Sequence, residues 1–153
     1  MLLSITSAGQ IVLAGPTPYF VIIDRALRDE GTSYHYAVAS EYGEADPAGL
    51  AVYATAPAAA GFLVPVAPAL TSDSPFRAAA AAIAAAKRRG ILGVEMEAAA
   101  LYTFAKARQA NVLCIAHVTN TMGQAEQDFE KGEADGTGDA LQILEAIVRA
   151  RML

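Results

Sequence analysis

The sequence predicts an α/β fold, with a single three-layer domain over residues 1–153 in which helices flank a mixed, mostly parallel central sheet. The chain is 54% hydrophobic, and its 153 residues are the length of one domain. Residues 112–118 form a continuous apolar run, which is typical of a strand buried on both faces of a sheet. Helical patterns alternate with such strands along the second half of the chain, as in an α/β fold.

The first half of the chain predicts strands separated by polar segments. Residues 2–5 indicate a short strand that enters a turn of small residues at 6–9. Residues 19–23 are β-branched and aromatic and predict a buried strand. Residues 24–36 are rich in charged and hydroxyl groups, which fits either a solvated loop or a loop that shapes a polar pocket or a subunit contact. A short helix with loops is expected within residues 40–61.

The second half predicts one more strand and three helices. Residues 62–70 are apolar but contain prolines, which favours an edge strand or a bulge over a regular central strand. The alanine-rich residues 78–89 predict a helix that ends in basic side chains before Gly90. Residues 97–110 predict an amphipathic helix. Thr137 or Asp139 can cap a last helix, which is expected to turn three side chains inward: Leu141, Leu144 and Val148.

Charge and cysteine usage narrow the classes of partner. The net charge of −5 argues against nucleic acid or an anionic membrane as partners. Cys114 is the only cysteine, so no intrachain disulfide forms, and its apolar surroundings predict a buried, inert thiol. His35 has no second ligand at a workable spacing, so no metal site is expected. With no targeting segment in view, a cytoplasmic location is expected.

The most informative stretch is Glu95-Met96-Glu97, which lies between an apolar approach and an alanine-rich helical pattern. If it ends a strand, the two carboxylates point the same way. If it begins a helix, the macrodipole favours both acids in the first turn. Acids at a strand-to-helix junction can accept hydrogen bonds from vicinal hydroxyls such as a ribose diol. An ordinary helix start rich in glutamate is the alternative.

Two more polar clusters follow strands of the predicted sheet. Residues 71–77 carry hydroxyls and an acid after one apolar run, and Asn120 follows another. In an open α/β sheet, ligands bind where strand ends meet at one edge. The three clusters together therefore favour a binding site over an ordinary helix start.

Residues 95–101 strongly resemble the Glu-Met-Glu signature of the nucleoside phosphorylases that include uridine phosphorylase and hexameric purine nucleoside phosphorylase. The similarity continues through residues 28–36, 71–77 and 118–120, in the family's order. The resemblance implies a pentosyltransferase that cleaves the N-glycosidic bond of a nucleoside with inorganic phosphate. The products are ribose 1-phosphate and free base. Phosphate is a co-substrate, and no cofactor or metal is implied.

The resemblance also implies roles for particular residues. Glu97 is implied to be the catalytic and ribose-binding carboxylate, with Met96 lining the sugar face of the ribose site and Glu95 supporting it. Carboxylates near the sugar stabilise its oxocarbenium-like transition state. The base site is implied to contain three residues: Phe76, Arg77 and Asn120. Purine-specific relatives carry an acid at the position of Asn120, so the amide favours a uridine-phosphorylase-like enzyme.

The phosphate site is the weakest part of this resemblance. Ser7 and Gly9 match a phosphate-contact turn, but Ser4 stands where an arginine is expected. The family's glycine-rich phosphate loop is not found ahead of Leu2, so the chain is expected to be the C-terminal portion of such an enzyme. A homo-oligomer is expected, with a missing N-terminal partner segment as a further option.

Four alternatives to an active uridine-type enzyme stay open. The chain can be a non-catalytic remnant, or one piece of a split enzyme that binds nucleoside or mediates assembly. It can also be a purine nucleoside phosphorylase or a nucleosidase.

Overall fold

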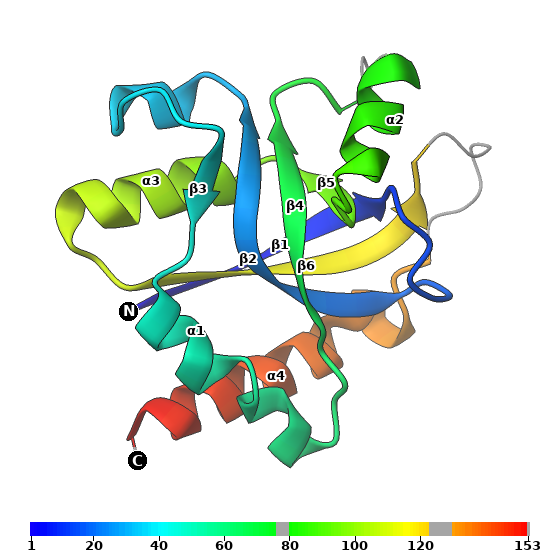
Figure 1. The fold of residues 1–153 in the computed structure, drawn as a ribbon. Helices are drawn as coiled ribbons and strands as arrows, with labels where there is room; N and C mark the ends of the chain where they lie inside the picture. The colour runs from blue at the N-terminus through cyan, green and yellow to red at the C-terminus, as the bar shows by residue number, and fades with distance from the viewer. Residues whose placement is uncertain (76–79, 123–129, 153) are drawn as a thin grey trace.

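The computed structural model describes residues 1–75, 80–122 and 130–152. These contain a six-stranded mixed sheet, four α-helices and three short 3-10 helices (Figure 1). The strands are β1 (Leu2–Gln10), β2 (Tyr19–Asp29), β3 (Tyr42–Glu44), β4 (Val66–Ser72), β5 (Gly93–Glu95) and β6 (Val112–Thr121). The α-helices are α1 (Pro47–Tyr53), α2 (Ala80–Arg88), α3 (Ala98–Arg108) and α4 (Thr137–Met152). The 3-10 helices are η1 (Thr32–His35), η2 (Ala56–Ala60) and η4 (Glu133–Gly136).

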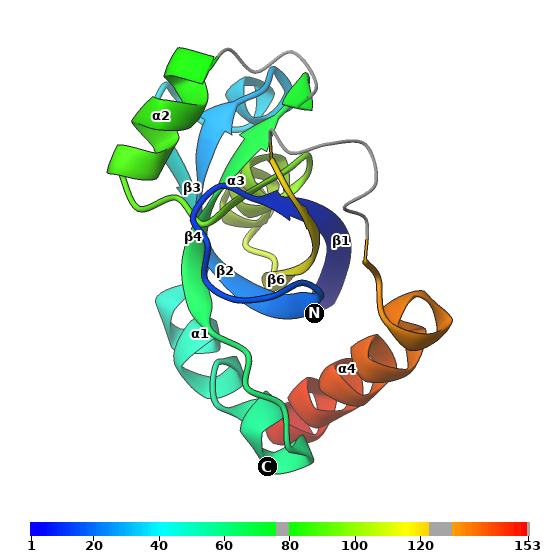
Figure 2. The same ribbon diagram turned by 90° about the vertical axis from the view of Figure 1, so that its right-hand side faces the viewer.

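The sheet closes on itself instead of forming the open layer that the sequence predicts. Its strand order is β3-β2-β4-β5-β1-β6, and an additional pairing joins β2 to β6 (Figure 2). The first residues of β2 pair antiparallel with β6, and its later residues pair with β4 and β3. One long strand therefore bridges both ends of the sheet. The mixed sheet with flanking helices is confirmed, but the three-layer arrangement is wrong, because the sheet is a barrel-like ring.

β2 contains a bulge where it pairs with β4. Its register with β4 shifts between Ile23 and Ala26, so Asp24 and Arg25 lie opposite Pro68. A bulge bends a strand and increases its twist, which helps a sheet to curl. Pro68 is thus tolerated in β4 even though β4 lies between β2 and β5 inside the sheet. The sequence allowed an edge strand or a bulge within residues 62–70, whereas in the structure the extra residue lies in β2, opposite Pro68.

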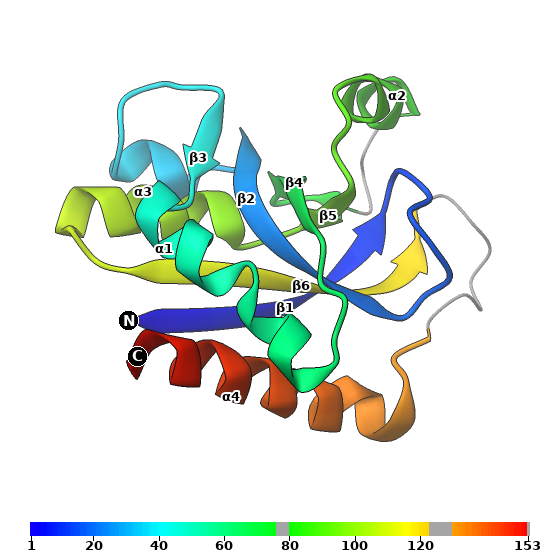
Figure 3. The ribbon, with the colours of Figure 1, turned by 60° about the horizontal axis from the view of Figure 1, so that its bottom comes forward.

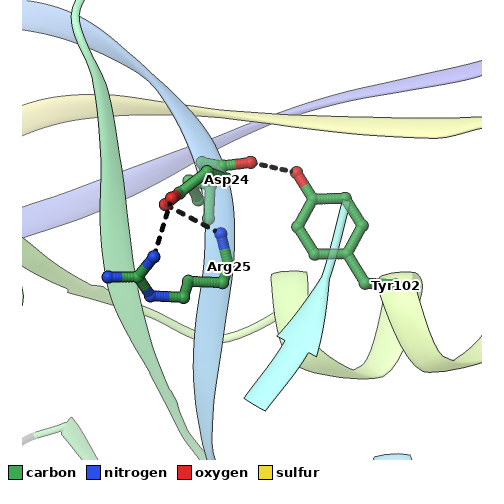
Figure 4. A network of polar contacts seen from close by, with 4 residues as sticks. Asp24, Arg25 and Tyr102 are labelled. Carbon is green, nitrogen blue, oxygen red and sulfur yellow. Dashed lines mark hydrogen bonds and ion pairs between the residues drawn. The ribbon is translucent and has the colours of Figure 1, made fainter. Parts of the chain in front are cut away.

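Tyr102 on α3 ties two strands of the ring together. Its hydroxyl donates to the Ile23 carbonyl at the bulge over 2.5 Å and accepts the Cys114 N–H at 3.0 Å. Figure 4 shows the bond to β2 beside the ion pair of Asp24 and Arg25, whose charged atoms are 3.2 Å apart. Tyr102 is 1% exposed, so its hydroxyl serves backbone groups that have no access to water.

The two faces of β6 support two parts of the core. Its even-numbered residues from Val112 to Val118 join the cluster that packs on α3. Leu113 and Ile115 join the cluster that packs on α4, which runs beneath β1 in Figure 3. Both faces are buried, as the continuous apolar run predicts. β6 lies parallel to β1 and antiparallel to β2, so the parallel expectation holds on one side only.

The structure corrects several element predictions. β1 continues through residues 6–9, where a turn was expected, and β2 extends into the segment expected to be a loop. The helix α4 forms, but Leu141 and Val148 are exposed and Ile143 and Ile147 are fully buried. The helices predicted around residues 78–89 and 97–110 are confirmed over Ala80–Arg88 and Ala98–Arg108. No helix in the described part of the chain has the length and hydrophobicity to cross a membrane.

Candidate functional site

The Glu-Met-Glu stretch lies at the junction of β5 and α3. β5 ends at Glu95, α3 begins at Ala98, and Glu97 occupies the N-cap position without a capping bond from its own side chain. Instead, the buried Glu95 carboxylate accepts the N–H groups of Glu97 at 2.8 Å and Ala98 at 2.7 Å. Glu95 therefore supplies the anionic cap that the start of α3 requires.

Thr71 at the end of β4 completes this cap. Its hydroxyl donates to Oε1 of Glu95 and accepts the N–H of Ala99 at 2.9 Å. Thr71 also pairs with Glu95 across the two parallel strands. The predicted cluster at residues 71–77 is thus in direct contact with the acidic stretch through its first residue.

Burial raises the pKa of the Glu95 carboxyl, and the nearby charge of Glu97 acts in the same direction. The hydrogen bonds from Thr71, Glu97 and Ala98 oppose that rise. Glu95 is 2% exposed, and both of its oxygens are bonded inside the protein. Glu95 therefore stabilises the junction of β5 and α3, and Glu97 is the acid of this stretch that can contact a ligand.

Glu97 points toward β1. Its Oε2 accepts the Thr6 hydroxyl at 2.6 Å and the Met96 N–H at 3.1 Å. No donor among the described residues reaches Oε1. The side chain is half-buried, and the neighbouring Met96 is 48% exposed. One carboxylate oxygen is therefore anchored and the other is open, next to an accessible apolar side chain.

Thr6 is the contact that the sequence did not reveal. The expected turn at residues 6–9 hid the alternation of β1, in which Thr6 lies on the same face as the buried Ala8. Adjacent residues of a strand point to opposite faces, so Ser7 faces away from Thr6. The Ser7 hydroxyl lies 3.2 Å from the Thr119 hydroxyl of β6. The sequence signal that was missed is the alternation of residues 2–8, which continues the strand through Thr6 to Ala8.

Asn120 lies across β1 from the acidic stretch. β1 pairs with β5 on one side and β6 on the other, and Gly9 is opposite both Val94 and Asn120. A Cβ on Gly9 would lie 3.2 Å from Nδ2 of Asn120 and 2.7 Å from Sδ of Met122. Gly9 and Thr6 are three residues apart, about 10 Å along a strand. The acidic stretch that follows β5 and Asn120 on β6 thus lie on opposite sides of β1, and β5 and β6 run in opposite directions.

Two predicted base-site residues, Phe76 and Arg77, lie outside the described residues. A cleft of about 500 Å³ lies between β3, α1 and α3, with Tyr42, Asp46 and Lys106 in its wall. It contains none of the predicted site residues. Among the residues that the structure places, no group of three or more His, Cys, Asp or Glu side chains is arranged to hold a metal ion.

Comparison with known families adds one finding to this geometry. A sequence profile described as the phosphorylase superfamily matches residues 1–149, nearly the whole chain. A search of curated proteins found no match.

Proposed function

The chain belongs to the phosphorylase superfamily, and from this premise we propose that it is a uridine-phosphorylase-like nucleoside phosphorylase. In this reaction a phosphate oxygen forms a bond to the sugar C1′ while the bond from C1′ to the base nitrogen breaks. The electron pair of that bond leaves with the base, which takes up a proton. The products are ribose 1-phosphate and the free base.

This proposal rests on the different hydrogen bonding of the two oxygens of the Glu97 carboxylate. Thr6 and the Met96 N–H hold Oε2, while Oε1 has no donor from the described residues. A carboxylate accepts hydrogen bonds only, and a sugar hydroxyl can donate one. Glu97 is therefore assigned to grip a ribose hydroxyl through Oε1, with the exposed Met96 side chain against the sugar.

Charge stabilisation is the second contribution of Glu97. Cleavage of a glycosidic bond develops positive charge on the sugar ring, and a fixed carboxylate beside the ring lowers the energy of that state. The anchored geometry matters here, because a preorganised charge needs no rearrangement during the reaction. Glu95 contributes by holding the backbone of Glu97 and Ala98 in place.

The base and phosphate sites are assigned on the family's pattern. Asn120 is assigned to the base through its amide, which can both donate and accept hydrogen bonds. Ser7 and Gly9 are assigned to phosphate on the family's pattern alone, because the Ser7 side chain faces away from Thr6 and its hydroxyl lies 3.2 Å from the Thr119 hydroxyl. Phe76 and Arg77 are assigned to the base by resemblance alone.

The test is turnover of a nucleoside panel with and without phosphate. Uridine, thymidine, inosine and adenosine are incubated with the protein, and both base and ribose 1-phosphate are measured. We expect phosphate-dependent release of uracil with an equal amount of ribose 1-phosphate. Base release in water alone would indicate a nucleosidase. An absence of turnover in both buffers would reject catalysis by this chain.

A further inference from the structure

We propose that Thr6 sets how strongly this site distinguishes ribose from 2′-deoxyribose, by occupying one oxygen of the Glu97 carboxylate. This inference rests on the proposed function, because it assigns the sugar to Glu97. It concerns a residue that the resemblance gives no role. Its basis is the bond of 2.6 Å from the Thr6 hydroxyl to Oε2 of Glu97.

The hydrogen-bonding capacity of Oε2 is filled. A carboxylate offers about four lone-pair sites, two on each oxygen. Thr6 and the Met96 N–H donate to Oε2, at 2.6 Å and 3.1 Å. Oε1 keeps both of its sites, because no donor from the described part of the chain reaches it. The carboxylate thus presents a single open oxygen to a ligand.

Ribose and 2′-deoxyribose differ in the number of hydroxyl groups that can donate a hydrogen bond to this carboxylate. Ribose carries two neighbouring hydroxyls, and a carboxylate is used most fully when two parallel donors reach different oxygens. Here the second oxygen is already taken by Thr6. The diol gains little over a single hydroxyl, so the wild-type protein discriminates weakly between the two sugars.

Removal of the Thr6 hydroxyl frees one site on Oε2. Thr6→Val keeps the shape of the side chain. In this variant Oε2 of Glu97 accepts only the Met96 N–H. We expect the ratio of the dissociation constants of 2′-deoxyuridine and uridine to rise about tenfold, the effect of one added hydrogen bond to a charged group. Thr6→Ser retains a hydroxyl and is expected to restore the wild-type ratio.

The experiment measures both dissociation constants by calorimetry for the wild type, Thr6→Val, Thr6→Ser and Thr6→Ala. Thr6→Ala is a second variant without the hydroxyl, in case Thr6→Val folds poorly. If Thr6 has a purely structural role, its removal weakens the binding of both nucleosides equally and leaves the ratio of their dissociation constants unchanged. That result would overturn the inference while the proposed function stands. If the wild type binds neither nucleoside, the proposed function fails and this inference fails with it.

Discussion

Two glutamates two positions apart have different environments. Glu95 is buried and bonded through both oxygens to the start of α3, whereas Glu97 is half-buried with one open oxygen. Carboxylates of one type acquire different roles when burial and hydrogen bonding differ. The resemblance implied a ribose contact for Glu97 and a supporting role for Glu95, and the structure adds the different burial and hydrogen bonding of the two carboxylates.

His117 is a second residue whose environment governs its chemistry. Its ring stacks on Phe20 with centroids 4.5 Å apart, and its buried Nε2 has no hydrogen-bond partner in the described structure. Gly136 of η4 lies against the ring, where a Cβ would come within 3.0 Å of Nε2. Burial lowers the pKa of His117, Lys131 lowers it further, and Asp139 opposes both effects.

A pH dependence of stability follows from His117. The folded protein binds this proton less readily than the unfolded chain, whose histidine titrates near pH 6.5. The free energy of unfolding is therefore expected to fall as pH drops below about 6.5. Urea unfolding at pH 7.5 and 5.5 measures the loss, and His117→Gln should show a smaller one. An equal loss in this variant would assign the effect to other groups.

Asn120 gives a prediction about the base. An amide cannot deliver a proton to a leaving purine, whereas a carboxylic acid can. Asn120→Asp is expected to raise the turnover of inosine relative to uridine by about 100-fold, a value at the lower end for general acid catalysis. The ratio of kcat/KM for the two nucleosides measures the change. The assignment would be refuted by a ratio equal to that of the wild type.

At the scale of elements, the start of α3 depends on a neighbouring strand. Three consecutive N–H groups, those of Glu97, Ala98 and Ala99, are satisfied by Glu95 and Thr71. The sequence predicted a helix here from periodicity and an acidic start. It could not show that its cap comes from β4, because Thr71 lies 24 residues before Glu95.

Removal of the Thr71 hydroxyl tests this cap. Thr71→Val is expected to destabilise the protein by about 2 kcal/mol, because the Ala99 N–H and the Glu95 carboxylate both lose a buried partner. Chemical denaturation measures the loss. Thr103→Val is the matched control, since the Thr103 hydroxyl only adds a bond to the Ala99 and Ala100 carbonyls within the same helix. Equal losses in the two variants would remove the special role of Thr71.

Sequence periodicity predicted some helices better than it predicted their buried faces. Alanine content and basic ends located α2, and the apolar run located β6. The predicted buried face of α4 was wrong, because Ile143 and Ile147 form a second apolar stripe next to the stripe of Leu141, Leu144 and Val148. Which stripe turns inward depends on where the barrel lies, and that is a property of tertiary packing.

For the whole molecule, the closed sheet is what local sequence patterns could not predict. The ring depends on pairing between Tyr19–Ile22 and residues 115–118, almost 100 positions later. It also depends on the bulge at Asp24 and Arg25. The contact between the polar ends of β4 and β5 was anticipated, because residue types that can bind a ligand followed these runs in the sequence. The expectation that the end of β6 lies at the same edge was wrong, because β6 is antiparallel to β2 and β2 is parallel to β4.

Cys114 reports on this closure. It is fully buried in β6 between β1 and β2, and burial raises the pKa of its thiol. The thiolate is the reactive form, so the native protein should not react with a thiol reagent. Labelling is expected to become complete in urea at the same midpoint as global unfolding. Labelling at a lower urea concentration would show that the strands around Cys114 separate before the rest of the fold.

The central claim is that the open oxygen of Glu97 holds the sugar of a nucleoside. Its most direct test compares the binding of uridine and of free uracil by calorimetry in the wild type, in Glu97→Gln and in the control Glu44→Gln, an exposed acid on β3. Glu97→Gln is expected to weaken uridine binding by about 10- to 100-fold, with uracil binding unchanged and Glu44→Gln equal to the wild type. Unchanged uridine affinity in a folded Glu97→Gln protein would contradict the claim.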